Sequence, residues 1–344
     1  MTDAPSSLDA FIARLPKVEL HLHLEGSIRP GTLEELAARK SWLKQKVADW
    51  VSERQRESYR YGSFERFLAA YVLVAQMLEA PEDYALATTR LIEWLAVQHV
   101  KYAEVTLSAG VILWKKQPLD AIFEAMAQAT SEAGERCGVR VHWIFDAIRQ
   151  FGADHARAVL EWASRFLSQG VVAFGIGGDE IRGPAALFVG VYRQARDLGL
   201  HVTAHAGETA GPASIRDAVE LLRAERIGHG LTLLRDPSVV DVVRARGIPL
   251  EVCPTSNVAT GLIADFEGHP LPQFLGAGLK VTVNSDDPAM FGTSLEGEFQ
   301  LAARTFGLSS RQIVELGENA IGATFLPEDE QAVLLRELHA AAAF

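Results

Sequence analysis

The chain has 344 residues, of which 48% are hydrophobic and 22% are charged, as in an ordinary globular protein with a sizeable core. Its formal net charge of −11 argues against a nucleic-acid backbone or an anionic membrane as the main partner. Only two cysteines occur, residues 1–15 lack a signal-peptide pattern, and no apolar run approaches the ~20 residues of a membrane span. These features predict a cytoplasmic protein.

The first strand-like segment is Val18–Leu24, which is largely strand-compatible and is followed closely by a glycine. Residues i and i+2 of a strand point to the same face, so His21 and His23 project together. Two imidazoles on one face near a strand end form half of a divalent metal site. Two packed or surface histidines are the alternative for this stretch taken alone.

Further β-rich runs alternate with longer helical patterns along the chain. We expect strands at residues 18–24, 102–107, 139–147, 171–176, 201–205, 226–227, 249–252 and 280–283, and helices at 30–39, 119–136, 155–167, 184–198, 213–222 and 239–246. This alternation predicts an α/β fold, a (β/α)8 TIM-type barrel, as a single domain over residues 1–344. An open doubly wound sheet is the alternative, but it would want a glycine-rich phosphate turn after the first strand.

Extra helices are expected in two places. The insertion at residues 40–98 is too long for a plain crossover, and it contains an amphipathic pattern at Phe64, Phe67, Leu68, Tyr71, Val72 and Ala75. We favour extra core for this helix, and a lid over the barrel lined by Phe64 and Phe67 is the alternative. The tail after Ser294 should form two or three helices that pack on the barrel.

Polar residues follow most of the predicted strands, and in a barrel these strand ends converge on one rim. The relevant stretches are His21-Leu-His23, Gly177-Gly-Asp-Glu180, His205-Ala-Gly-Glu208, Gly228-His-Gly230, Cys253-Pro-Thr-Ser-Asn257 and Asn284-Ser-Asp-Asp287. Each stretch is weak alone, because glycine, aspartate and asparagine are also turn formers. The other histidines, at positions 99, 142, 155, 201, 269 and 339, fall elsewhere and are interpreted as structural.

The residue types at the strand ends fit one catalytic zinc ion. His21, His23, His205 and Asp286 would supply three nitrogens and a carboxylate, and a bound water would become a nucleophile near neutral pH. Glu208 could shuttle protons, while His229 and Asp287 could hold the hydroxide or the substrate. A two-metal hydrolytic barrel usually needs a carboxylated lysine after strand 4, and residues 171–183 contain no lysine. Iron, cobalt or manganese would also suit this ligand set.

These motifs together resemble the adenosine deaminase family of the amidohydrolase superfamily. The matching pieces are Pro16-Lys-x-Glu-Leu-His-x-His-Leu, Gly178-Asp-Glu180, His205-Ala-Gly-Glu208, Arg226-Ile-Gly-His-Gly230, Cys253-Pro-x-Ser-Asn257 and Asn284-Ser-Asp-Asp-Pro288. They occur in the family's order over residues 16–288. The His-x-Glu and Pro-Cys-x-x-Cys pattern of the deaminases that act on bases in nucleic acid is absent.

The resemblance implies a role for each matched position. His21, His23, His205 and Asp286 resemble the zinc ligands, with one zinc per chain. Glu208 resembles the proton shuttle that protonates purine N1, and His229 the residue that orients the hydroxide. Asp287 resembles the carboxyl group that contacts N7, and Gly178 the backbone position that contacts N3.

Two departures from the family bear on the substrate. Adenosine deaminases typically read His-x-His-Leu-Asp-Gly, in which the aspartate reaches the ribose, whereas this chain has Glu25. The fourth strand ends in Gly175-Ile-Gly-Gly-Asp-Glu180 rather than in Asp-Leu-Ala-Gly-Asp-Glu. The expected substrate is a small-molecule purine nucleoside of the adenosine or 2′-deoxyadenosine type. The related 6-aminodeoxyfutalosine of menaquinone synthesis, which bears a large 5′ substituent, is the alternative, and free adenine is less favoured.

Two other functions compete with a zinc-dependent nucleoside deaminase. One is a different amidohydrolase, such as a lactonase or phosphotriesterase, which two metals per chain would favour. The other is a binding module that senses a nucleoside without turnover, which the intact catalytic positions disfavour. The sequence leaves the oligomeric state open, and a homo-oligomer is compatible with it.

Overall fold

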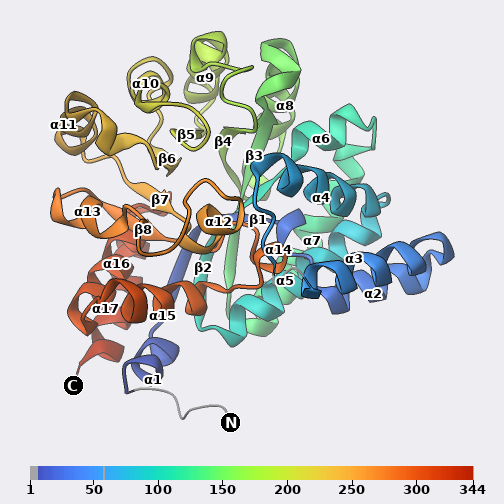
Figure 1. Ribbon diagram of the computed structural model, residues 1–344. Helices are drawn as coiled ribbons and strands as arrows, with labels where there is room; N and C mark the ends of the chain where they lie inside the picture. Colours follow the sequence, from blue (N-terminus) through green and yellow to red (C-terminus); the bar gives the residue numbers. More distant parts are fainter. Residues whose placement is uncertain (1–6, 57–58, 344) are drawn as a thin grey trace.

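The computed structural model describes residues 7–56 and 59–343, and it confirms the predicted TIM barrel. Eight strands pair in parallel in the order of the chain, and the helices lie around them (Figure 1). The strands are β1 (Lys17–His23), β2 (Val100–Leu107), β3 (Arg140–Ile148), β4 (Val171–Gly177), β5 (His201–Ala206), β6 (Arg226–His229), β7 (Leu250–Val252) and β8 (Val281–Val283). Each of the eight overlaps a strand expected from the sequence.

The helices include several that the sequence analysis did not separate. In the first half of the chain they are α1 (Ser7–Arg14), α2 (Pro30–Arg39), α3 (Lys44–Arg56), α4 (Phe64–Met77), α5 (Pro81–Val97), α6 (Ala109–Trp114), α7 (Leu119–Cys137) and α8 (Gly152–Arg165). In the second half they are α9 (Val189–Asp197), α10 (Pro212–Asp217), α11 (Pro237–Arg246), α12 (Pro254–Ala259), α13 (Leu271–Gly276), α14 (Pro288–Phe291), α15 (Leu295–Phe306), α16 (Ser310–Gly322) and α17 (Glu328–Ala342). The extra helices between strands 1 and 2 and at the C-terminal end are thus present.

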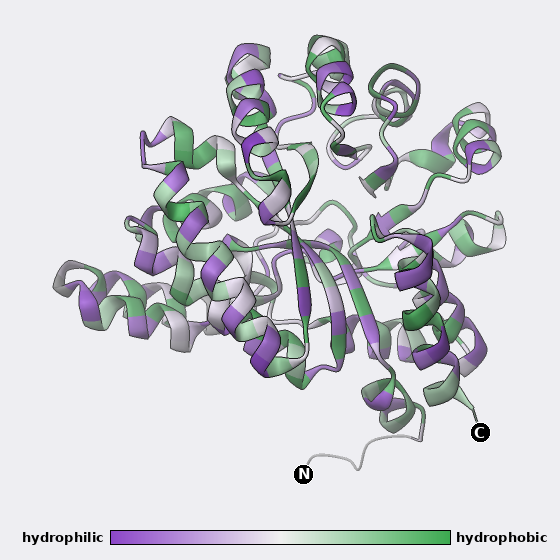
Figure 2. Ribbon diagram, turned by 180° about the vertical axis from the view of Figure 1, so that it is seen from behind, coloured by the Kyte–Doolittle hydropathy of each residue, from purple (hydrophilic) through white to green (hydrophobic). Residues whose placement is uncertain are grey.

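Strand β1 explains how a polar site can sit inside a buried sheet. Its sequence alternates strictly between polar and apolar residues, yet all seven positions are buried. Because side chains alternate between the two faces of a strand, Glu19, His21 and His23 share one face and Leu20 and Leu22 share the other. Figure 2 shows this banding of hydrophobic and hydrophilic residues along the strands.

The barrel closes between β8 and β1 through side-chain as well as backbone bonds. The side-chain oxygen of Asn284 accepts hydrogen bonds from the amides of Leu20, at 3.0 Å, and His21, at 3.2 Å. Beyond it, the Asp286 amide donates to the His21 carbonyl and the Asp286 carbonyl accepts from the His23 amide, both at 3.0 Å. The seam therefore places Asp286 directly beside the two histidines of β1.

Helix α4 of the insertion packs on the core and also lines a cavity. Ser63 caps its N-terminus by accepting a hydrogen bond from the Arg66 amide. Phe67 packs in the core against Phe291, with ring centroids 5.0 Å apart, and it also lines a cavity at the barrel rim together with Phe64. The expectation of extra core thus holds for Phe67, and the movement of α4 as a lid stays a prediction.

Among the residues that the structure describes, no helix is long and apolar enough to cross a membrane.

Glu298 of α15 is an ionisable group buried in this core. Its carboxylate accepts hydrogen bonds from the Thr255 amide, at 3.1 Å, and from the Thr293 hydroxyl, at 2.5 Å. Burial raises the pKa of Glu298 to about 7 from its ordinary 4.5, although both hydrogen bonds lower it. Because the folded state binds this proton more tightly, the associated stability is present at low pH and is lost as the pH rises through the folded pKa.

We therefore expect Glu298→Gln to remove this pH dependence. Between about pH 4 and about pH 8 the free energy of unfolding of the wild type should fall by up to about 3 kcal/mol relative to the variant. Denaturant unfolding at several pH values would measure the difference. Glu315→Gln, at an exposed position of α16, is the matched control and should follow the wild type. Parallel pH profiles for Glu298→Gln and the wild type would refute the assignment.

Candidate active site

The four predicted metal ligands converge at the carboxyl-terminal ends of the strands. His21 and His23 end β1, His205 lies in β5, and Asp286 follows β8. The Nε2 atoms of His21 and His23 lie 3.5 and 3.3 Å from the same oxygen, Asp286 Oδ1. The ring centroid of His205 lies 4.6 Å from that of His21 and 5.4 Å from that of His23. Three imidazoles and one carboxylate thus surround a common point.

Hydrogen bonds on the outer side of the cluster fix three of these ligands. His21 Nδ1 lies 2.9 Å from Glu251 Oε2, and His205 Nδ1 lies 3.3 Å from the Ile176 carbonyl oxygen. Each contact requires a proton on Nδ1, which leaves the Nε2 lone pair to face the cluster. Ser256 donates to Asp286 Oδ2 at 2.7 Å, so the other oxygen of that carboxylate faces the histidines.

Distance alone admits two further ligands. The donor atoms of His21, His205 and His229, and those of His21, Cys253 and Asp286, lie within 4.8 Å of one another. Burial holds the pKa of the Cys253 thiol well above its usual range, so this thiol stays protonated and is a poor ligand. His23 belongs to the cluster through its 3.3 Å approach to Asp286.

The electrostatics of the cluster fit a divalent cation. Burial lowers the pKa of His23 to about 4 and that of His205 well below its usual range, so both imidazoles are neutral, as metal ligands must be. Burial opposes protonation of His21 as well, but the neighbouring carboxylates of Asp286 and Glu251 raise its pKa to about 10. The buried Nε2 of His21 has no hydrogen-bond partner among the described residues. A cation bound there would replace the proton of His21 and satisfy that nitrogen.

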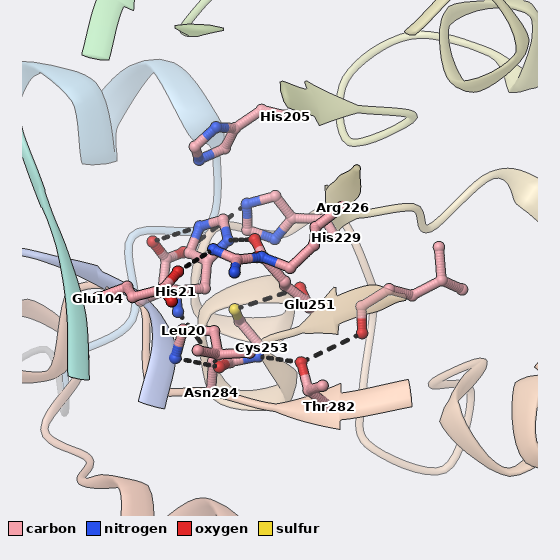
Figure 3. Close-up of polar contacts among 12 residues, drawn as sticks. Leu20, His21, Glu104, His205, Arg226, His229, Glu251, Cys253, Thr282 and Asn284 are labelled. Atoms are coloured by element: carbon pink, nitrogen blue, oxygen red, sulfur yellow. Dashed lines mark hydrogen bonds and ion pairs between the residues drawn. The ribbon is translucent and has the colours of Figure 1, made fainter. Parts of the chain in front are cut away.

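A network of buried charged residues lies next to Nδ1 of His21. The sequence analysis did not identify this network. Arg226 donates from Nε to Glu251 at 2.5 Å, and its Nη2 lies 2.6 Å from Glu104 Oε2 (Figure 3). Burial opposes ionisation of Glu251, but Arg226 and His21 together lower its pKa. Glu251 therefore remains an anion that accepts the Nδ1 proton of His21. Glu104 and Glu251 lie inside apolar runs, which is why the sequence pattern gave no sign of them.

Glu208 and His229 face the cluster from β5 and β6. His229 Nε2 lies 3.6 Å from Glu208 Oε1 and 4.0 Å from Asp286 Oδ2. Burial, and then the charge of Asp286, hold the pKa of Glu208 well above its usual range, which favours the protonated form of this carboxyl. Burial lowers the pKa of His229 to about 3, so its imidazole is neutral. The pair can donate and accept protons beside the predicted metal ligands.

Glu180 positions the loop that carries Glu208. Its carboxylate accepts hydrogen bonds from the amides of Gly207, Glu208 and Thr209 at 2.8–2.9 Å, and Ser214 also donates to it. The sequence motif Gly178-Asp-Glu180 was matched without a role for Glu180. The structure gives it one, because three consecutive amides held on one carboxylate fix the loop after β5.

The backbone is strained at two site residues. His229 has φ of +64° and Asp286 has φ of +62°, in the left-handed region that residues with a Cβ rarely adopt. Such strain costs about 1–3 kcal/mol for each residue and persists only where the surroundings enforce it. Here the bonds across the β8–β1 seam hold Asp286 in place. The strain aims both side chains into the cluster.

A cavity beside the cluster, here called the site cavity, brings most of the predicted residues together. It is lined by His23, Phe64, Phe67, Leu68, Tyr71, Val72, Ser108, Val111, Asp146, Ile148, Gln150, Phe151, Gly177, Gly178, His205, Glu208, His229, Asp286 and Asp287. The list includes the predicted substrate contacts Asp287, Gly178, Phe64 and Phe67. Asp287 Oδ1 is buried without a hydrogen-bond partner among the described residues, and burial and Asp286 hold the pKa of Asp287 well above its usual range.

Glu25, the predicted sugar contact, lies outside the lining of the site cavity. It is buried, and its two oxygens accept hydrogen bonds from the Tyr71 hydroxyl at 3.1 Å and the Ser108 amide at 3.2 Å. Tyr71 and Ser108 do line the cavity. A contact between Glu25 and a substrate therefore stays a prediction. Tyr71 and Ser108 hydrogen-bond to Glu25 and line the cavity, so they would connect Glu25 to a substrate bound there. Sequence reasoning could not foresee this, because Tyr71 comes from the insertion.

Of the six histidines interpreted as structural, His269 is linked to the site by hydrogen bonds. His201 pairs with Glu225 at 2.8 Å and His142 contacts the Tyr102 hydroxyl at 3.0 Å, both away from the cluster. His269 is buried and contacts Asn257, whose side chain in turn contacts His229, each at 3.1 Å. The motif Cys253-Pro-Thr-Ser-Asn257 was the available signal for this link.

The barrel and the site together define a hydrolytic deaminase of the amidohydrolase superfamily, a class that depends on metal. A family model described as adenosine deaminase matches residues 16–341, so the chain belongs to the adenosine deaminase family.

Known proteins similar to this chain share its length as well as its fold. It is 38% identical to an aminodeoxyfutalosine deaminase of Streptomyces coelicolor, over 98% of this chain and 87% of that protein. The crystal structure of an adenine deaminase from Arthrobacter aurescens matches with a TM-score of 0.87 and 31% identity, over 95% of this chain and 98% of that one. An amidohydrolase from Burkholderia ambifaria with bound Zn matches with a TM-score of 0.84 and 26% identity, over 99% and 96%.

If Glu251 tunes the metal site, Glu251→Gln should weaken zinc binding by about 10- to 100-fold, because the neutral amide no longer supports His21. Competition with a chromophoric chelator would measure the dissociation constant, and thermal unfolding would verify the fold. Glu225→Gln is the matched control, since it removes a glutamate that pairs with His201 outside the site. Equal zinc affinity in both variants would exclude the proposed role of Glu251.

Proposed function

We propose that the protein is a zinc-dependent hydrolase that removes the 6-amino group of an aminopurine nucleoside as ammonia. The observation that carries the proposal is the convergence of Glu208, His229 and Asp287 with three of the four predicted metal ligands on one cavity. A carboxyl group that can donate a proton, a neutral imidazole and a second carboxyl group beside an N3O ligand set are the groups that this hydrolysis requires. The zinc-bound relative with the same fold supports the choice of metal.

His21, His23, His205 and Asp286 would hold the zinc, which supplies an activated water nucleophile at neutral pH. Burial and the charge of Asp286 raise the pKa of Glu208, which favours a protonated carboxyl that can donate to a ring nitrogen of the purine. That proton draws electrons from the ring and makes the carbon that bears the amino group electrophilic. The raised pKa of Asp287 likewise favours its protonated form, which can donate a hydrogen bond to another ring nitrogen. Water adds at that carbon, the amino nitrogen takes up a proton, and ammonia leaves.

The walls of the site cavity favour a nucleoside with a large 5′ substituent, such as 6-aminodeoxyfutalosine, over adenosine itself. Beyond the polar cluster the lining includes an apolar group formed by Phe64, Leu68, Val72, Val111 and Phe151, together with polar residues such as Ser108 and Gln150. Trp114 stacks on Phe151 and is 61% exposed, which extends this apolar surface outward. Among the described residues that line the cavity none is a lysine or an arginine, which disfavours a nucleotide phosphate. The aminodeoxyfutalosine deaminase relative supports the same choice.

Free adenine is the second candidate. Glu25 lies at the position where the family contacts the sugar. Both of its carboxylate oxygens already accept hydrogen bonds, one from Tyr71 and one from Ser108, so a sugar contact would have to replace one of them. The similarity to an adenine deaminase structure also favours free adenine as the substrate. A base without a sugar would leave the apolar part of the cavity unfilled.

A substrate panel tests the proposal directly. Zinc-loaded protein should release ammonia from 6-aminodeoxyfutalosine with a higher kcat/KM than from adenosine, 2′-deoxyadenosine or adenine. Metal analysis should give one zinc per chain, whereas two would favour another amidohydrolase. Binding without turnover would support a nucleoside sensor. Failure of the loaded protein to act on any of the four compounds would overturn the proposal.

Phe151→Ala tests the apolar part of the cavity. Loss of the ring should raise KM for the nucleoside with the large substituent by about tenfold, or about 1.4 kcal/mol, because its apolar contact is lost. KM for adenine should change little, so adenine serves as the control within the same preparation. Steady-state kinetics on both compounds would measure the ratio. An equal rise for both would place Phe151 outside the substituent site.

Glu208→Gln tests the proton donor. The amide cannot donate a proton to the ring, so kcat should fall about 1,000-fold while the zinc content stays at that of the wild type. Stopped assays with concentrated enzyme and metal analysis would measure both quantities. Glu220→Gln, at an exposed position after α10, is the matched control. A near-normal kcat in Glu208→Gln would remove Glu208 from the proton transfer.

A further inference from the structure

Three buried side chains form a hydrogen-bonded chain that leads from a helix terminus to the metal cluster. The Leu271 amide donates to His269 Nδ1 at 3.2 Å, and His269 Nε2 lies 3.1 Å from Asn257 Oδ1. The Asn257 side-chain nitrogen lies 3.1 Å from His229 Nδ1. Each of the three side chains is at most 1% exposed, so no solvent water competes for these contacts.

The backbone amide at the outer end gives this chain a single direction. Leu271 is the first residue of α13, and an amide at that position has no partner inside its own helix. It can only donate, so His269 Nδ1 must accept and His269 Nε2 must carry the proton of the neutral ring. That proton is donated to Asn257 Oδ1, which turns the amide nitrogen of Asn257 toward His229. His229 Nδ1 therefore accepts, and its own proton lies on Nε2.

We infer that His269 and Asn257 are positioning residues that hold His229 in the tautomer with the proton on Nε2. This is the nitrogen that faces Glu208 Oε1, at 3.6 Å, and Asp286 Oδ2, at 4.0 Å. With a proton there, His229 donates a hydrogen bond into the reaction centre and has no lone pair to offer a metal. The opposite tautomer would make His229 a fourth imidazole ligand, which its distances alone would permit.

Packing makes the direction hard to reverse. The ring of His269 stacks on Phe306 of α15, with centroids 5.6 Å apart, and this contact fixes the ring plane. Reversal would point the Nδ1 proton of His269 at the Leu271 N–H, so that two donors would face each other in a buried site. The free-energy cost of leaving the Leu271 N–H without an acceptor thus keeps the proton of His229 on Nε2, although His229 lies two side chains away.

The first test reads the tautomer in the wild type and needs no turnover, although the kinetic arms rest on the proposed function. In zinc-loaded protein labelled with 15N-histidine, nitrogens with and without a proton have well-separated chemical shifts. The signals of His229 are assigned by their loss in His229→Gln. We expect a protonated Nε2 and an unprotonated Nδ1. A proton on Nδ1 of His229 would overturn the inference outright.

The second test reverses the chain with an isosteric change. Asn257→Asp can only accept, so His229 should move its proton to Nδ1 and turn the lone pair of Nε2 toward the cluster. We expect the 15N shifts to exchange and kcat to fall about 100-fold or more, with zinc retained. Cobalt substitution should show an altered visible spectrum if His229 then joins the ligands. An unchanged tautomer in this variant would contradict the inference.

The third test acts at His269, away from the reacting atoms. In His269→Gln the side chain can accept from Leu271 and donate to Asn257, so the direction of the chain is kept. In His269→Glu it can only accept, so Asn257 must turn and His229 must change tautomer. The two variants have nearly the same size, and only the glutamate should exchange the His229 shifts and lower kcat about 100-fold. Equal kcat and equal shifts in both would reduce His269 to a packing role and overturn this part of the inference.

Discussion

The seam between the last and the first strand is the contact on which the site depends. With three residues in β8, the sheet cannot close by a long ladder, and the Asn284 side chain supplies acceptors that a neighbouring strand would otherwise provide. The next bonds belong to the backbone of Asp286, so the residue that closes the barrel also carries the predicted carboxylate ligand. Asp286 has a left-handed backbone conformation at the position where it both closes the sheet and presents its carboxylate. Fold closure and ligand geometry are thus one constraint.

The inside of the barrel carries more charge than stability alone would favour. Arg226, Glu104 and Glu251 are almost fully buried, and taking each ion out of water costs about several kcal/mol before pairing offsets it. Apolar residues of similar volume would often stabilise such a core as well or better. These charges orient the site instead. Glu251 accepts a hydrogen bond from His21 Nδ1, which leaves the other ring nitrogen facing the cluster. Glu180 does the same for the loop of Glu208 with backbone amides.

The barrel and the convergence of the predicted ligands could be obtained from the sequence, because they depend on local pattern. Alternation in β1 places His21 and His23 on one face, and parallel strands bring His205 and Asp286 to the same rim. The support of these residues could not be obtained in this way. Glu104 and Glu251 are hidden in apolar runs, and the surroundings of Glu25 depend on Tyr71, which lies 46 residues away. Helix α1 was missed, and α12–α14 are too short to leave a periodic signal.

The seam joins the two ends of the chain, since Asn284 bonds to an amide 264 residues earlier. When synthesis has reached β4, only two of the four predicted ligands exist, namely His21 and His23 of β1. Strand β5 then adds one more, His205. The carboxylate arrives with the final strand, together with the bonds that close the sheet. A metal held by all four predicted ligands could therefore bind only after the last strand has paired, because long-range pairing must precede it. A fragment released early from the ribosome would carry loose imidazoles but no assembled centre.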